Sequence, residues 1–142
     1  MSKIAVVYWS GTGNTAAMAE AVAKGARDNG AAVTLFNLDD TPFSGTDVPN
    51  YDAIAFGCPA MGAEELEDST FQPAFENCLE ELADKKVALF GSYGWGGGEW
   101  MSTWEETCND RGIVLACESV ICNEAPDDEA LAACQALGAA LA

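Results

Sequence analysis

Apolar runs that suit buried strands alternate along the chain with segments whose apolar residues recur at helical spacing. Largely continuous apolar runs, as in strands buried on both faces, span residues 3–9, 32–38, 52–57, 86–91 and 113–121. Apolar positions at three- and four-residue intervals predict helices over residues 14–29, 71–84, 99–111 and 126–142. This alternation predicts the α/β class, with a parallel sheet covered by helices on both faces.

Three loops stand out because each follows a predicted strand and combines glycine with polar or large side chains. They read SGTGNT after the first strand, CPAMGAEELEDS after the third and SYGWGGGEW after the fourth. The carboxyl ends of parallel strands lie at one edge of a sheet, where doubly wound folds bind their ligands. We therefore expect the three loops to form one ligand site.

The first loop has the composition of an anion site, although it contains no Lys, Arg or His. It lacks the lysine of a nucleoside-triphosphatase loop, but Gly11, Gly13 and Ala16 match the dinucleotide fingerprint G-x-G-x-x-A. Asp39 or Asp40, after the second strand, would be the acidic partner of that motif. Alternatively, the hydroxyl, amide and backbone N–H groups of residues 10–15 enclose a single phosphate at a helix N-terminus. An ordinary strand-to-helix turn is the purely structural alternative.

The other two loops favour the single phosphate. Met61 stands beside Gly62 in one loop, and Trp95 stands beside Gly96 in the other. A planar ring between the thioether and the indole would have both faces covered, and each such contact contributes about 0.3–1.5 kcal/mol. Together with the first loop, this pair predicts an aromatic mononucleotide as the ligand.

The chain is strongly acidic, with six basic and 23 acidic residues, no histidine and a net charge of −17. No basic residue lies between Arg27 and Lys85, which excludes nucleic acid and anionic membrane surfaces as partners and favours a cationic protein. Solubility or adaptation to salt is the alternative explanation of the excess charge.

The six cysteines predict neither a metal site nor a disulfide framework, because no C-x-x-C spacing occurs and no histidine is available as a co-ligand. We expect reduced thiols in a cytoplasmic protein. The length predicts a single domain over residues 1–142. The short apolar run at the N-terminus meets SGTG, so we expect no signal peptide and no membrane span.

Three segments carry a resemblance that runs through nearly the whole chain. YWSGTGNT, GCPAMGAEELEDS and KKVALFGSYGWGGGEW resemble the corresponding segments of short-chain flavodoxins, notably those of anaerobic bacteria. The resemblance implies a three-layer sandwich with a five-stranded parallel sheet of order 2-1-3-4-5, an order of which flavodoxin is itself a standard example. It also implies one non-covalently bound FMN and a low-potential one-electron carrier, not an enzyme, that shuttles mainly between semiquinone and hydroquinone.

The same resemblance assigns roles to single residues. Residues 10–15 would hold the phosphate, and Met61 and Trp95 would cover opposite faces of the isoalloxazine. The carbonyl of Gly62 would turn toward flavin N5 when one electron and a proton arrive, Glu64 would accept from N3–H, and Asn123 would lie near the flavin. The complete set of expected FMN-binding residues is Trp9, Ser10, Gly11, Thr12, Gly13, Asn14, Thr15, Pro59, Ala60, Met61, Gly62, Ala63, Glu64, Ser92, Tyr93, Gly94, Trp95, Gly96 and Asn123.

Two positions depart from the pattern of some relatives. Ala63 follows the turning glycine where some relatives carry Asp or Ser, and Gly97 stands where some carry a polar residue. Ala63 permits the peptide flip but changes its energetic cost, so no relative's exact potential transfers to this chain.

The acidity fits a reducing carrier. A carboxylate ~10 Å from the flavin, at an effective dielectric constant of ~20, opposes an added electron by about 1.7 kcal/mol, or roughly 70 mV before screening. Reductases and acceptor proteins are expected to dock transiently on the monomer at an acidic rim that includes Glu64, Glu65, Glu67 and Asp68.

Three other functions stay open on the sequence. A flavoenzyme would reduce its substrate directly with a nicotinamide, but the 142 residues contain no second nucleotide-binding segment. A dinucleotide-binding domain would use the G-x-G-x-x-A motif literally. A divalent-cation buffer has only the acidic run EELED in its favour, without a glycine-centred calcium loop.

Overall fold

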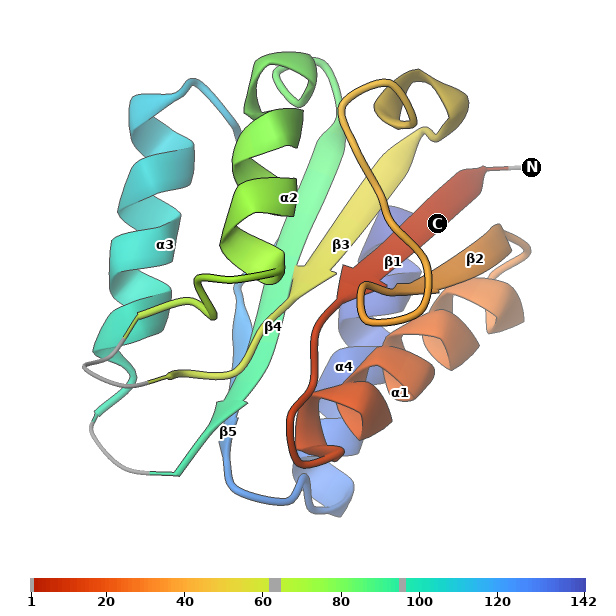
Figure 1. Cartoon of the computed structure of the whole chain (residues 1–142). Coiled ribbons are helices and arrows are strands. Elements are labelled where there is room, and N and C mark those ends of the chain that lie inside the picture. Colours follow the sequence, from red (N-terminus) through yellow and green to blue (C-terminus); the bar gives the residue numbers. More distant parts are fainter. Residues whose placement is uncertain (1, 62–64, 95–96) are drawn as a thin grey trace.

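The computed structural model describes residues 2–61, 65–94 and 97–142, which form a sheet between two layers of helices (Figure 1). The strands are β1 (Lys3–Tyr8), β2 (Ala32–Asn37), β3 (Ala53–Gly57), β4 (Lys86–Tyr93) and β5 (Val120–Asn123). The helices are α1 (Asn14–Asp28), α2 (Phe71–Cys78), α3 (Glu99–Asp110) and α4 (Asp128–Leu141), with 3-10 turns η1 (Val48–Asn50) and η2 (Leu79–Glu81). The strands are parallel in the order β2-β1-β3-β4-β5, which confirms the predicted fold class and strand order.

The two faces of the sheet carry separate hydrophobic cores. Large residues of β3 and β4, such as Phe56 and Leu89, pack in a core with α2 and α3 on one face. On the other face, Ala55, Ala88 and Phe90 of the same strands pack with α1 and α4. These two helices approach so closely that a Cβ on Gly25 would collide with the carbonyl oxygen of Gln135, and a Cβ on Gly138 with that of Val22. The crossing fixes α1, whose N-terminus follows the first loop.

The fifth strand is shorter and begins later than the apolar run at residues 113–121 predicts. Leu115 forms an isolated bridge with Val87, and β5 then begins with Val120 opposite Phe90. The chain thus advances five residues, from 115 to 120, while β4 advances three, from 87 to 90. Two residues between Leu115 and Val120 therefore have no partner in β4. Val114, just before the bridge, is 78% exposed. At an open edge, the apolar composition of the run does not force continuous pairing.

Two helix boundaries also differ from the sequence pattern. The segment predicted as one helix over 71–84 ends its α-helical part at Cys78 and continues as the 3-10 turn η2. Helix α4 begins after Asp127, whose carboxylate accepts a hydrogen bond from the N–H of Ala130 at 2.8 Å, so Pro126 precedes the cap. Within the described ranges, no helix combines the length and the apolar character needed to cross a bilayer.

Candidate functional site

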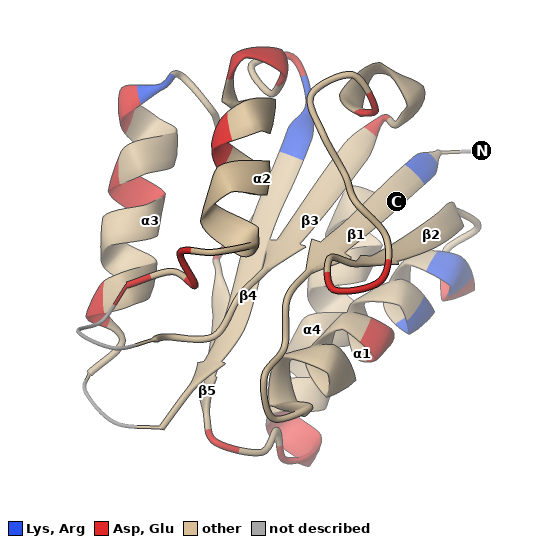
Figure 2. Ribbon diagram, in the orientation of Figure 1, with Lys and Arg blue, Asp and Glu red and all other residues tan. Residues whose placement is uncertain are grey.

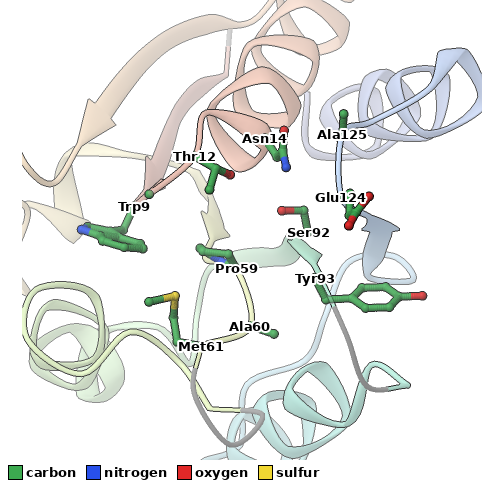
Figure 3. A pocket seen from close by; sticks show the side chains of 12 residues that line it. Trp9, Thr12, Asn14, Pro59, Ala60, Met61, Ser92, Tyr93, Glu124 and Ala125 are labelled. Atoms are coloured by element: carbon green, nitrogen blue, oxygen red, sulfur yellow. The ribbon is translucent and has the colours of Figure 1, made fainter.

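A cavity of about 650 Å³ opens at the carboxyl edge of the sheet, where the loops after β1, β3, β4 and β5 converge (Figure 3). The described residues that line it are Trp9, Gly11, Thr12, Asn14, Pro59, Ala60, Met61, Ser92, Tyr93, Gly94, Glu124 and Ala125. All but the last two belong to the set expected from the sequence. The structure therefore brings the three predicted loops to one cavity.

The first loop is shaped by its own serine and glycine. The Ser10 hydroxyl accepts hydrogen bonds from the N–H groups of Gly13 at 3.1 Å and Ala16 at 3.2 Å. Gly13 caps α1 with φ of 95°, a left-handed conformation that side chains other than glycine rarely adopt. Ser10 and Gly13 thus shape the loop from outside the cavity lining, and they present Gly11, Thr12 and Asn14 to it.

Trp9 forms one wall of the cavity and is fixed from behind. Its indole Nε1 donates to Asp39 Oδ1 at 3.1 Å. A Cβ on Gly11 would lie 3.1 Å from the same ring, closer than an ordinary van der Waals contact, so glycine lets the loop pass close to the indole. One carboxylate oxygen of Asp39, a candidate ribose partner in the dinucleotide interpretation, thus binds a tryptophan of this wall.

The second loop leaves β3 tied to its neighbours by backbone hydrogen bonds. The N–H of Ala60 donates to Ser92 at 3.0 Å, and Met61 and Glu65 exchange two bonds at 2.8 and 3.0 Å. Met61 is 39% exposed and points its thioether into the cavity opposite the Ser92 and Glu124 side (Figure 3). An apolar side chain held exposed at a cavity is well suited to contact a ligand.

The third loop couples the cavity to α1 and to the last loop. The Ser92 hydroxyl lies 3.4 Å from the Thr15 hydroxyl, and both side chains are buried. The Tyr93 carbonyl accepts from the N–H of Glu124 at 2.7 Å and from Asn123 Nδ2 at 3.3 Å. Thr15 and Asn123 therefore brace the walls, and neither lines the cavity.

Five of the expected site residues lie outside the described residues: Gly62, Ala63, Glu64, Trp95 and Gly96. The expectation that Met61 and Trp95 face each other across a ring therefore stays a prediction. The same holds for the roles expected of Gly62 and Glu64.

Glu124 and Ala125 line the cavity although no motif identified them. They follow β5 at the same edge as the other loops, and an ending of the last strand at residue 123 would have drawn attention to them. The apolar run, however, suggested that this strand ends at residue 121. The misplaced strand end explains the omission.

Glu67 does not belong to an exposed rim. It is 8% exposed, and its carboxylate accepts three backbone N–H groups, from Ser69 at 2.9 Å, Thr70 at 2.8 Å and Phe71 at 2.7 Å. Its own N–H donates to Cys58 Sγ at 3.4 Å. The carboxylate thus satisfies the free donors at the start of α2 and anchors the second loop. Glu65 and Asp68 are exposed, as expected for a rim.

The basic residues are restricted to one end of the molecule, whereas acidic residues lie at both ends (Figure 2). The basic residues occupy strand starts and helix ends, at the edge away from the cavity: Lys3, Lys24, Arg27, Lys85, Lys86 and Arg111. The carboxyl edge carries exposed acids such as Asp39, Asp40, Glu65, Asp68 and Asp127. No basic residue is among the described residues that line the cavity.

All six cysteines are free thiols. Burial raises the pKa of Cys58, Cys78 and Cys134 to about 12 and that of Cys108 to about 11. These thiols stay protonated at neutral pH and pack as apolar side chains in the two cores.

Comparison with known proteins agrees with the geometry. The flavodoxin family profile matches residues 6–138. A flavodoxin from Megasphaera elsdenii is 45% identical over 139 residues, 98% of each chain, and one from Clostridium beijerinckii is 46% identical over 87% of this chain and 88% of the relative.

Solved structures show the same fold. The solution structure of two-electron reduced Megasphaera elsdenii flavodoxin matches with a TM-score of 0.86 at 46% identity and covers 97% of both chains. A flavodoxin structure from the domain Archaea matches with a TM-score of 0.82 at 28% identity, over 98% of this chain and 95% of that one. The chain therefore belongs to the flavodoxin family, small electron-transfer flavoproteins whose cofactor is FMN.

Proposed function

We propose that this protein is a low-potential one-electron carrier that holds one FMN non-covalently in the 650 Å³ cavity and shuttles mainly between semiquinone and hydroquinone. The observation that carries the proposal is a cavity that joins uncharged phosphate donors to apolar walls, with no basic residue in its described lining. Membership of the flavodoxin family supports the cofactor.

The first loop fits a phosphate. No described residue accepts a hydrogen bond from the backbone N–H groups of Gly11, Thr12, Asn14 or Thr15. Two of these donors lie in the first turn of α1, which contains no acidic residue. Free N–H groups at a helix N-terminus bind phosphate without a formal positive charge, with the helix dipole as support. Residues 10–15 would hold the FMN phosphate in this way.

The rest of the cavity fits a flavin ring and its sugar chain. Apolar side chains line it on the β1 and β3 side, from Trp9, Pro59, Ala60 and Met61. Ser92, Tyr93 and Gly94 line the β4 side. Met61 would cover one face of the ring and Trp95 the other, with Gly62, Ala63, Glu64 and Gly96 beside them. When bound, FMN supplies the one-electron chemistry.

The protein's own contribution is to bind the flavin, limit its contact with water and surround it with uncompensated negative charge. Each carboxylate ~10 Å away, at an effective dielectric constant of ~20, disfavours an added electron by about 1.7 kcal/mol before screening. The basic residues lie at the opposite edge of the sheet, and none lines the described part of the cavity (Figure 2). The arrangement favours a low potential for the second electron.

We further propose that redox partners dock at the acidic carboxyl edge through cationic surfaces, on a monomer working in the cytoplasm. Exposed Glu65 and Asp68 flank the Met61 side of the cavity, and the free thiols suit a reducing compartment. Reversing the charges of Glu65 and Asp68 should slow electron transfer to a reductase at low salt. The control variant reverses Glu80, at the other edge, and should keep the wild-type rate. Equal rates for both variants would contradict this docking site.

Ligand identity tests the function directly. Apoprotein titrated with FMN should quench flavin fluorescence at a one-to-one ratio, whereas NAD should leave the intrinsic tryptophan fluorescence unchanged. Binding of NAD in preference to FMN would support the dinucleotide interpretation instead. Rapid reduction of the bound flavin by NAD(P)H without a reductase, in stopped flow, would favour a flavoenzyme.

A further inference from the structure

Trp100 contacts two walls of the cavity from behind, although it is not among the described residues that line it. Its side chain belongs to α3 and is 1% exposed, and its indole Nε1 donates a hydrogen bond to the Cys58 carbonyl at 3.2 Å. Cys58 comes directly after β3, and the three residues that follow it line the cavity: Pro59, Ala60 and Met61. The hydrogen bond therefore ties α3 to the point where the second loop begins.

The ring of Trp100 also packs against Tyr93, the last residue of β4, which lines the cavity. The two ring centroids lie 5.5 Å apart at an interplanar angle of 50°. Aromatic pairs at this separation attract each other beyond the burial of their area, so the indole restricts where the tyrosine ring can lie. One buried side chain thus contacts the β3 wall through its N–H group and the β4 wall through its ring.

The contact between the indole and the Cys58 carbonyl leaves no spare room. A Cβ on Gly91 of β4 would collide with the carbonyl oxygen and would lie 3.2 Å from Cζ2 of Trp100. Cys58 is 0% exposed in the core that also contains Trp100, where the bond to the indole stands in for hydration of the carbonyl. The peptide that leads into Pro59 is therefore fixed between β4 and α3.

We propose that Trp100 is a positioning residue, whose N–H group and ring hold the β3 and β4 walls of the cavity in the arrangement that binds the flavin. The inference rests on the proposed FMN site, and Trp100 acts on it from outside the described lining. Without the N–H group, the Cys58 carbonyl loses its buried donor, and the start of the second loop is held less tightly. Binding then has to order this wall, and that ordering reduces the affinity.

Trp100→Phe tests the N–H group, because this change keeps an aromatic ring in the core. The dissociation constant for FMN, measured by quenching of flavin fluorescence on addition of the apoprotein, should rise about tenfold. The backbone N–H groups of Ala60 and Met61 donate hydrogen bonds just beyond Cys58. In the apoprotein they should exchange with deuterium about tenfold faster. Replacing Trp100 with benzothienylalanine, which keeps the bicyclic ring and lacks only the N–H group, should reproduce both changes.

Trp104→Phe is the matched control, because this residue lies about one turn later in α3 and packs in the same core. It is 2% exposed, and among the described residues its Nε1 has no hydrogen-bond partner. This variant should keep the FMN affinity and both exchange rates within about twofold of the wild type. Wild-type values in Trp100→Phe, or equal changes in the two variants, would overturn the inference. Failure of the wild-type apoprotein to bind FMN would instead overturn the proposed function, and the exchange rates would still show whether Trp100 holds the second loop.

Discussion

Replacing Glu67 with glutamine tests whether this residue anchors the second loop or belongs to the docking rim. In the structure its Oε1 accepts from the N–H groups of Thr70 and Phe71, and its Oε2 accepts from that of Ser69. A glutamine retains one acceptor oxygen but presents its amide to the remaining N–H donor. The change therefore removes one charge-assisted hydrogen bond and weakens the two others. It also places the glutamine amide N–H against a backbone N–H, at a residue that is 8% exposed.

The expected cost follows from these contacts. Hydrogen bonds to charged groups contribute about 1.5–3 kcal/mol, and a buried donor left without an acceptor costs about 1–3 kcal/mol. We expect Glu67→Gln to lower the free energy of unfolding by about 2–3 kcal/mol. With a urea slope of about 2 kcal/mol per molar for a domain of this size, the unfolding midpoint should fall by about 1–1.5 M.

Urea unfolding of the apoprotein, followed by far-UV circular dichroism, measures this shift. Glu65→Gln is the matched control, because Glu65 is exposed in the same loop, and its free energy of unfolding should change by less than about 0.5 kcal/mol. Equal midpoints for the two variants, combined with slower electron transfer in Glu67→Gln alone, would refute the anchoring role and restore Glu67 to the rim.

Three further predictions concern packing, the first loop and the thiols. Gly25→Ala and Gly138→Ala should each lower the free energy of unfolding by about 1–3 kcal/mol in thermal unfolding, because a Cβ would meet the backbone of the facing helix. An unchanged free energy of unfolding would contradict the close crossing. Ser10→Ala should cost about 1 kcal/mol of stability and weaken FMN binding in a fluorescence titration, and unchanged affinity would show that the loop keeps its shape without this hydroxyl. At pH 7 a thiol reagent should react with the native protein only at half-buried Cys117 and Cys122. Labelling should become faster as pH rises, because burial raises the pKa of every thiol. Rapid labelling of all six cysteines would contradict the buried cores.

The sequence was sufficient for features that follow from periodicity and composition. Continuous apolar runs and glycine-rich loops predicted the parallel sheet and the edge at which the cavity opens, because buried strands and tight turns demand those residues. The position of β5 was wrong because an edge strand carries apolar residues without requiring continuous pairing. Glu67 was wrongly assigned to the exposed rim and Glu124 was missed, and both have a common reason. Whether a carboxylate in a loop caps a helix, lines a cavity or faces solvent depends on backbone directions that composition does not encode.

Stepwise reduction of the purified protein, followed by its visible spectrum, shows whether the bound flavin takes up its two electrons one at a time. We expect a flavin spectrum that passes through a blue neutral semiquinone after one electron equivalent and then bleaches in a separate step at a distinctly lower potential. Entry of both electrons in one step, or a purified protein that neither carries nor takes up FMN, would contradict it.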